Sequence, residues 1–255
     1  MAWQNTPRPL HLGLLIALPL IAASLLLTGP MPQDPGYHDF ADQRPVLGIP
    51  HGLNVLSNSA FLLVAGLGFA SLRRWHPPHG KDRLPYQTLC VGLIGVALGS
   101  GYYHLDPDTP RLFWDRLAMA VTFAALFAAV LNERLPAGHA PKLVGGLCTL
   151  AALSAGYWLV SEWLGRGDLR PYLLVQGIPI LLTPVLVLCC RSRHPANGWL
   201  LTAVALYLVA LAFDLSDAGV YQATGGTVSG HTVKHLVAAL AALCVVLRLR
   251  RLPSG

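Results

Sequence analysis

Long apolar runs dominate this chain of 255 residues and limit its possible folds more than any other feature. Eight of them are near the length that crosses a bilayer as a helix. Backbone groups in lipid must be hydrogen-bonded within their own segment, and a membrane β-barrel would show short alternating strands, so continuous apolar runs predict an all-α bundle. The expected spans are 10–28, 53–72, 86–104, 112–131, 142–163, 171–190, 198–215 and 230–247.

Composition agrees with a membrane protein. Hydrophobic residues make up 54% of the chain and charged residues only 12%, about half the charged fraction of an ordinary soluble domain. The net charge of +6 does not indicate a nucleic-acid partner, because the basic residues flank apolar segments and form no basic face with interleaved aromatics. We expect the bilayer itself to be a partner, and the sequence leaves the oligomeric state open.

The connecting loops predict an orientation. Basic residues gather in 73–85, in 191–197 and in the tail 249–255, whereas 29–51 and 214–230 are acidic or balanced. Basic loops stay on the cytoplasmic side, and these two sets alternate as eight spans require. We therefore expect both termini in the cytoplasm, in a multi-pass protein that suits a bacterial inner membrane.

The same pattern suggests four parts of the chain. Residues 1–30 would be an N-terminal transmembrane anchor, 31–51 an acidic outer loop or cap, 52–248 a seven-helix core, and 249–255 a basic cytoplasmic tail. A cleaved signal peptide is the alternative for the first part. The apolar run is long for a signal peptide, and "LLLTGPMPQ" is a poor cleavage site, which favours a retained anchor.

Polar residues interrupt the apolar spans at one membrane depth. Ser100 and His104 end the third span, Asp115 begins the fourth, and His231 and His235 begin the last. In the predicted orientation all five lie at the outer end. Residues four apart share a helix face, so the two imidazoles of the last span project together.

Three imidazoles at one depth favour a metal site. Neutral imidazole is the usual nitrogen ligand of zinc, and three His ligands plus a water form a catalytic arrangement with one open position. The alternative is that each histidine is an ordinary interfacial residue, and HxxxH pairs do arise by chance. Ionisable groups within spans are costly, however, and five polar residues at one level favour a function.

Four segments carry a resemblance to a known family. They are "GSGYYH" (99–104), "FWDRLAM" (113–119), "HTVKH" (231–235) and, upstream, "GLNVLSNSAFL" (52–62). In this order they resemble the alkaline ceramidases, which belong to a superfamily of seven-helix membrane zinc hydrolases that includes the adiponectin-receptor-like proteins. The resemblance covers roughly 40–247, so the first span would be an addition to a seven-helix hydrolase core.

The resemblance implies a zinc-dependent membrane amidase that hydrolyses a ceramide-like lipid to a fatty acid and a sphingoid-type amine. By position, His104, His231 and His235 would hold zinc, with Asp115 and Ser100 beside the metal-bound water. Zinc lowers the pKa of bound water to about 7. We expect Asp115 to act as general base and Ser100 to donate a hydrogen bond to the developing oxyanion.

The acidic outer loop offers a second, weaker site. Eukaryotic alkaline ceramidases bind calcium through an acidic segment before their first core helix, and Asp39, Asp42 and His51 lie in the corresponding stretch here. That stretch lacks the family's Trp-x-Glu-x-Asn run, and calcium requires six to eight oxygen ligands. Calcium is therefore disfavoured, and a folded cap over the zinc pocket, with Asp42 paired to Arg44, is favoured.

Other functions stay open at this point. A lipid-binding receptor or transporter would use the same polar cluster without turnover, and a haem protein would use the histidines as axial ligands. Lys234 in the last span suggests a retinal Schiff base, but it lies near the outer end, where a lysine can extend to water. Asp214 and Asp217 end the seventh span at the same depth and could orient a metal-binding imidazole.

Overall fold

The computed structural model describes Leu20 and residues 24–25, 27–135, 138–194 and 196–252. The span expected at 10–28, and with it most of the expected anchor, lies outside these residues. The described part is helical and has no strand; its only β-type pairing is an isolated bridge between Val46 and Ile49.

Within the described residues, seven helices are long and apolar enough to cross a membrane, which supports a multi-pass membrane protein. Their ends agree with expected spans two to eight to within three residues. The helices are α2 (Gly52–Ser57) continued by α3 (Ser59–Arg74), α4 (Leu84–Leu105), α5 (Thr109–Asn132), α6 (Ala140–Trp163), α7 (Arg170–Cys189), α8 (Gly198–Leu215) and α10 (Gly230–Leu249).

Three shorter helices lie in the connections. The 3-10 helices η2 (Pro35–His38) and η3 (Gly80–Arg83) precede α2 and α4, and α9 (Asp217–Ala223) lies between α8 and α10. The connection 214–230, which the sequence predicts as an acidic loop, therefore contains a helix that no sequence pattern indicated.

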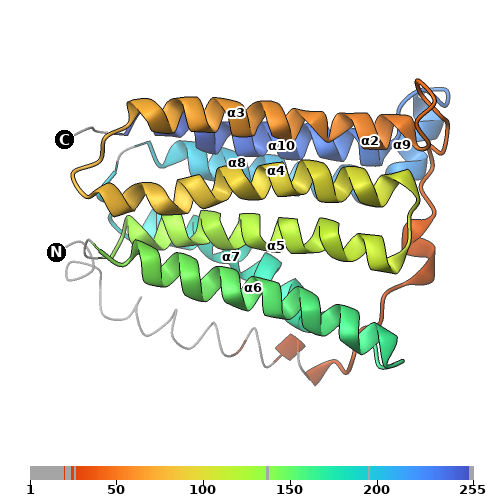
Figure 1. The fold of residues 1–255 in the computed structure, drawn as a ribbon, viewed down its shortest axis with the longest axis horizontal. Coiled ribbons are helices and arrows are strands. Elements are labelled where there is room, and N and C mark those ends of the chain that lie inside the picture. Colours follow the sequence, from red (N-terminus) through yellow and green to blue (C-terminus); the bar gives the residue numbers. More distant parts are fainter. Residues whose placement is uncertain (1–19, 21–23, 26, 136–137, 195, 253–255) are drawn as a thin grey trace.

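The spans form a closed bundle (Figure 1). Each of α3 to α8 packs on the next in chain order, and α10 closes the ring by packing on both α8 and α3, while α5 also contacts α7. This closure brings α10 beside the first core helix and places its beginning near the end of α4. Residues far apart in sequence therefore meet inside one end of the bundle, which we call the histidine end.

Local sequence fixes where the helices of the histidine end begin and how closely they approach. The Asp108 side chain accepts from the Arg111 backbone N–H at 2.7 Å at the start of α5, and Ser229 accepts from Thr232 at 3.1 Å at the start of α10. Such caps satisfy the free N–H groups of a first turn. A Cβ on Gly99 would lie 2.6 Å from the Trp114 carbonyl oxygen, so only glycine permits this approach of α4 to α5.

The opposite end of the bundle holds a second buried polar group, which we call the inner cluster: Tyr86, Glu133 and Arg248. Both terminal nitrogens of Arg248 donate to Glu133 at 2.7 Å, and the Tyr86 hydroxyl also donates to that carboxylate. Burial alone would raise the pKa of Glu133, but the hydrogen bonds and charge of Arg248 outweigh it and hold that pKa below its usual value.

Candidate metal centre

Three histidines from two helices meet at the histidine end. His104 ends α4, and His231 and His235 face the same way from consecutive turns of α10. All three are at most 5% exposed. One ring nitrogen of each lies within 4.8 Å of the others, and His104 Nε2 is 3.1 Å from His231 Nε2. The expected convergence of the three histidines is therefore present in the fold.

Asp214, at the end of α8, orients the His231 ring. Its Oδ1 lies 2.7 Å from His231 Nδ1. A carboxylate can only accept a hydrogen bond from an imidazole, so this contact places the proton on Nδ1 and leaves Nε2 with a free lone pair. Carboxylate–imidazole contacts of this kind set the tautomer of metal-binding histidines.

Ser57 contacts Nδ1 of His235, as Asp214 does for His231. Its hydroxyl lies 2.8 Å from His235 Nδ1 and 3.1 Å from the Asn54 backbone carbonyl. When the hydroxyl hydrogen is directed to Asn54, the serine oxygen accepts from Nδ1–H. This arrangement leaves Nε2 of His235 unprotonated as well, so that both rings of α10 can present an Nε2 lone pair to a ligand.

The spacing of the three histidines allows a metal ion to bind between them. Nitrogens bound to one tetrahedral zinc at about 2.0–2.1 Å lie about 3.3 Å apart, close to the 3.1 Å between His104 and His231. The same distance suits an N–H···N hydrogen bond between neutral rings, so the geometry allows a metal without identifying one. Among the described residues, this is the one group of His, Cys, Asp or Glu side chains close enough together to hold a metal ion.

Phe40 covers the histidines from the side of the outer loop. Its ring centroid lies 4.4 Å from that of His231 and 4.7 Å from that of His104. Asp217 links the segment around Phe40 to α10. One of its carboxylate oxygens accepts from the Ala41 backbone N–H at 2.8 Å, and the other accepts from the His231 backbone N–H at 2.7 Å. In Figure 1 the segment before α2 runs across this end of the bundle.

The expected pairing of Asp42 with Arg44 is present. Both carboxylate oxygens of Asp42 accept from the guanidinium at 2.8 Å, and these bonds lower the pKa of the Asp42 carboxyl. Asp39 is exposed, and His51 begins α2 with its ring against Phe40. Asp42 is thus engaged by Arg44, and Phe40 of the same segment packs against the His104 ring.

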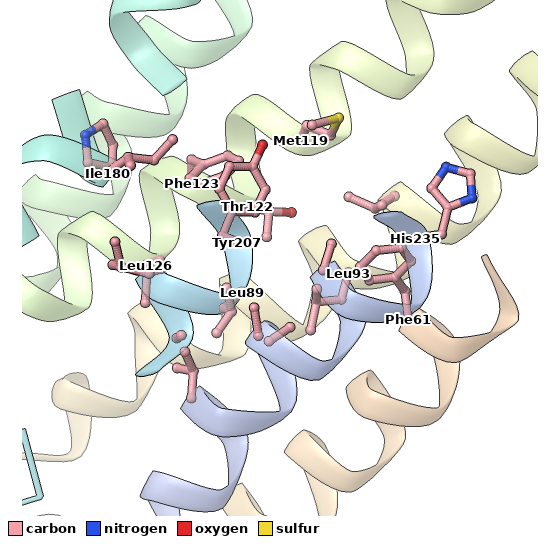
Figure 2. A pocket seen from close by; sticks show the side chains of 18 of the residues that line it. Phe61, Leu89, Leu93, Met119, Thr122, Phe123, Leu126, Ile180, Tyr207 and His235 are labelled. Carbon is pink, nitrogen blue, oxygen red and sulfur yellow. The ribbon is translucent and has the colours of Figure 1, made fainter. Parts of the chain in front are cut away.

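An apolar cavity extends from the histidine site into the bundle (Figure 2). Its lining runs from Ser100 to Leu89 on α4, from Asp115 to Leu126 on α5 and from Lys234 to Val245 on α10. Each stretch covers eleven steps along its helix, which corresponds to roughly 16 Å. His235 lies at one end of the labelled side chains in Figure 2, and Leu126 and Ile180 lie towards the other.

Ser100 and Asp115 line the cavity together with His235, and both are buried. The neighbouring Gly99 already provides the close helix packing, so Ser100 contributes a hydroxyl to the cavity wall as well as a small side chain.

Lys234 does not extend to water as the sequence suggested. Its side chain is 12% exposed, and Nζ pairs with Asp214 Oδ2 at 2.9 Å. A buried ammonium needs a partner, and the other oxygen of Asp214 is the one that contacts His231. The carboxylate therefore joins the lysine to a candidate metal ligand.

Sequence reasoning missed three residues of this site: Phe40, Asn54 and Ser57. The segment "NVLSN" carried a signal, because polar side chains at positions i, i+3 and i+4 form a polar stripe on an otherwise apolar helix. Phe40 carried none, since an aromatic residue in an acidic loop has no periodic context.

Comparison with known proteins adds no family assignment. No protein-family model matches the chain, and a search of curated proteins finds no match. The resemblance to alkaline ceramidases therefore stays a prediction from the four sequence segments, and the fold shown here is that of an all-α, multi-pass bundle with a candidate three-histidine metal centre.

Proposed function

We propose that the protein is a zinc-dependent membrane amidase that hydrolyses a ceramide-like lipid to a fatty acid and a sphingoid-type amine. One observation carries the proposal: His235, a member of the buried three-histidine group, lines an apolar cavity together with the carboxylate of Asp115 and the hydroxyl of Ser100. Ligand, acid–base group and lipid-sized space are thus gathered at one site, which is the pattern that a hydrolase of a lipid amide requires.

The residues divide the chemistry between them. His104, His231 and His235 would hold a zinc ion, which when bound would supply a Lewis acid that acidifies water and polarises a carbonyl. Asp115 takes a proton from the attacking water and returns it to the leaving amine. Ser100, which lines the same cavity as Asp115, donates to the oxygen on which negative charge develops.

The cavity supports a long-chain substrate. The lining follows the helices for roughly 16 Å, so the cavity can receive part of a hydrocarbon chain below the amide. Phe40 closes the loop side of the site, which favours lateral entry of the lipid between helices. The amide then stops at the level of the histidines while its chain fills the cavity.

The proposal includes an orientation. The histidine end faces the periplasm of a bacterial inner membrane, and the basic loops lie in the cytoplasm. An eighth span at 10–28, acting as an anchor, would place both termini on the cytoplasmic side.

A lipid-binding receptor or transporter is the second candidate, because the same cavity would hold a lipid amide without cleaving it. Turnover separates the two. A retinal protein is less well supported, since the Lys234 ammonium is already paired with Asp214.

The test combines metal analysis with turnover. Purified wild type should contain one zinc per chain and cleave members of a panel of lipid amides, and a chelator should stop cleavage. His231→Ala and His235→Ala should lose both zinc and turnover, whereas His79→Ala, which changes an exposed histidine outside the site, should keep both. Equal zinc in all variants, or intact lipid in every assay, would overturn the proposal.

A further inference from the structure

One buried acceptor in the cavity has no partner. Asn58, between α2 and α3, is 1% exposed and lines the cavity together with Ser100, Asp115 and His235. Its side-chain nitrogen lies 2.8 Å from the Asn54 carbonyl oxygen, whereas its Oδ1 has no hydrogen-bond partner. A backbone carbonyl can only accept, so the amide must turn its NH2 to Asn54, and this leaves the oxygen unpaired.

No side chain of the site donates to this oxygen. The Ser57 hydroxyl bonds to Asn54 and Lys234 pairs with Asp214, and the unpaired donors Asn54 Nδ2 and Thr183 Oγ1 form no hydrogen bond with it either. An unpaired carbonyl oxygen in an apolar cavity is unfavourable, and native proteins normally satisfy such groups. The missing donor is therefore expected on the molecule that occupies the cavity.

We propose that Asn58 accepts a hydrogen bond from the N–H of the substrate's secondary amide, and that this contact makes the site select amides over esters with the same chains. The inference rests on the proposed amidase function and specifies its substrate class. An ester has no hydrogen at the position of the amide nitrogen, and an N-methylated amide has lost it. Either molecule would bury the Asn58 oxygen and leave it unpaired.

The expected effect is substantial. Sites whose buried polar groups match a substrate donor reject analogues that lack it, because an unpaired group remains in the complex. For one neutral acceptor we expect roughly ten- to hundredfold discrimination.

The experiment compares three lipids with identical chains: the N-dodecanoyl derivative of a long-chain amino alcohol, its N-methyl analogue and the corresponding ester. kcat/KM is measured for wild type, Asn58→Leu and Thr183→Val. Thr183 is the matched control, because it is also 1% exposed, lines the same cavity and has an unpaired hydroxyl. The ratio of wild type to variant for each lipid cancels the intrinsic reactivity of esters.

We expect Asn58→Leu to lower kcat/KM for the secondary amide ten- to hundredfold more than for the other two lipids, and Thr183→Val to affect all three alike. Equal losses for all three lipids with Asn58→Leu would overturn the assignment, as would an equally selective loss with Thr183→Val.

A binding measurement keeps the assignment testable if Asn58→Leu misfolds. In a full-length Asp115→Asn protein, which should not turn over, the secondary amide should bind at least tenfold more tightly than its N-methyl analogue. Equal affinities would mean that only water meets the Asn58 oxygen, and would overturn the inference. Absence of cleavage by wild type with this preference intact would instead overturn the proposed amidase function alone.

Discussion

The two ends of this bundle bury polar side chains to the same degree but use them differently. In the inner cluster, Arg248 and Glu133 satisfy each other through two hydrogen bonds of 2.7 Å, and Tyr86 completes the set. At the histidine end, two imidazoles are oriented by Asp214 and Ser57 so that their Nε2 lone pairs remain free.

The comparison distinguishes polar groups that stabilise the fold from polar groups that are available to a ligand. Burying a charge is tolerable when its partner is present in the same chain, and such pairs act on folding. Oriented but unsatisfied groups next to a cavity reduce stability unless a ligand completes them, so they indicate a binding site. Substitutions at one end should therefore alter stability, and those at the other should alter ligand binding.

The largest expected effect is at the inner cluster. Arg248→Ala leaves the Glu133 carboxylate buried without its main partner, which should lower the free energy of unfolding by about 3–5 kcal/mol. Zinc per folded chain should not change, because the substitution is at the far end of α10 from the histidines. Denaturant unfolding in detergent micelles measures the first quantity and metal analysis the second.

Arg250→Ala is the matched control, since Arg250 is exposed at the end of the same helix; its effect should stay within about 0.5 kcal/mol. Zinc lost in proportion to stability in Arg248→Ala would show that the two ends are not separable.

The next largest effect should come from the carboxylate behind His231. Asp214→Asn weakens the hold on Nδ1–H and should reduce zinc affinity about 10- to 100-fold, measured by competition with a chelator. Lys234→Met removes the ion pair but keeps the contact of Asp214 with the ring, so its loss of affinity should be smaller. Equal losses in both variants would show that charge, and not ring orientation, governs the site.

Phe40 allows a smaller test. Phe40→Leu uncovers two histidine rings while keeping most of the apolar volume, so transfer of zinc to a chelator should become several times faster, at a stability cost of about 1 kcal/mol. Phe113→Leu is the control, because Phe113 packs against the same apolar group. An unchanged transfer rate in Phe40→Leu would mean that zinc leaves by another path.

The smallest effect concerns His194, which lies beside the inner cluster. Burial lowers the pKa of this imidazole below its usual 6.5, and its Nδ1 has no partner. Below about pH 6.5 the unfolded chain binds this proton while the folded chain does not, so stability is present at higher pH and falls as the pH drops.

His194→Gln should reduce the loss of unfolding free energy between pH 7.5 and 5.5 by about 1 kcal/mol or less. Unfolding curves of both proteins at the two pH values check it. A pH dependence identical in both proteins would show that His194 protonates equally in the folded and unfolded states.

Seven spans were predictable to within three residues because lipid imposes the same length and apolarity on each of them. The loops follow no such rule. The cap and α9 are held by contacts such as that of Ala41 with Asp217, which joins residues 176 positions apart, and no local pattern encodes such a pairing.

Part of the candidate metal centre was also predictable from the sequence. The depth of His104, His231 and His235 followed from span ends and helix periodicity, so their meeting could be expected. The side chains that orient the rings could not be predicted. Ser57 and His235, for example, are 178 positions apart and meet only through the packing of α2 and α3 on α10. Lys234 was misjudged because its partner Asp214 lies on another helix.

The length of the cavity has a consequence for membrane asymmetry. A space of roughly 16 Å, descending from the histidine end, covers about half of a 30 Å hydrocarbon core. A lipid of the nearer leaflet can slide in with its tail already pointing the right way, whereas one in the far leaflet must first flip. A lipid-cleaving activity such as the one proposed would therefore act on a single leaflet, and its rate would report how quickly lipids exchange between the two.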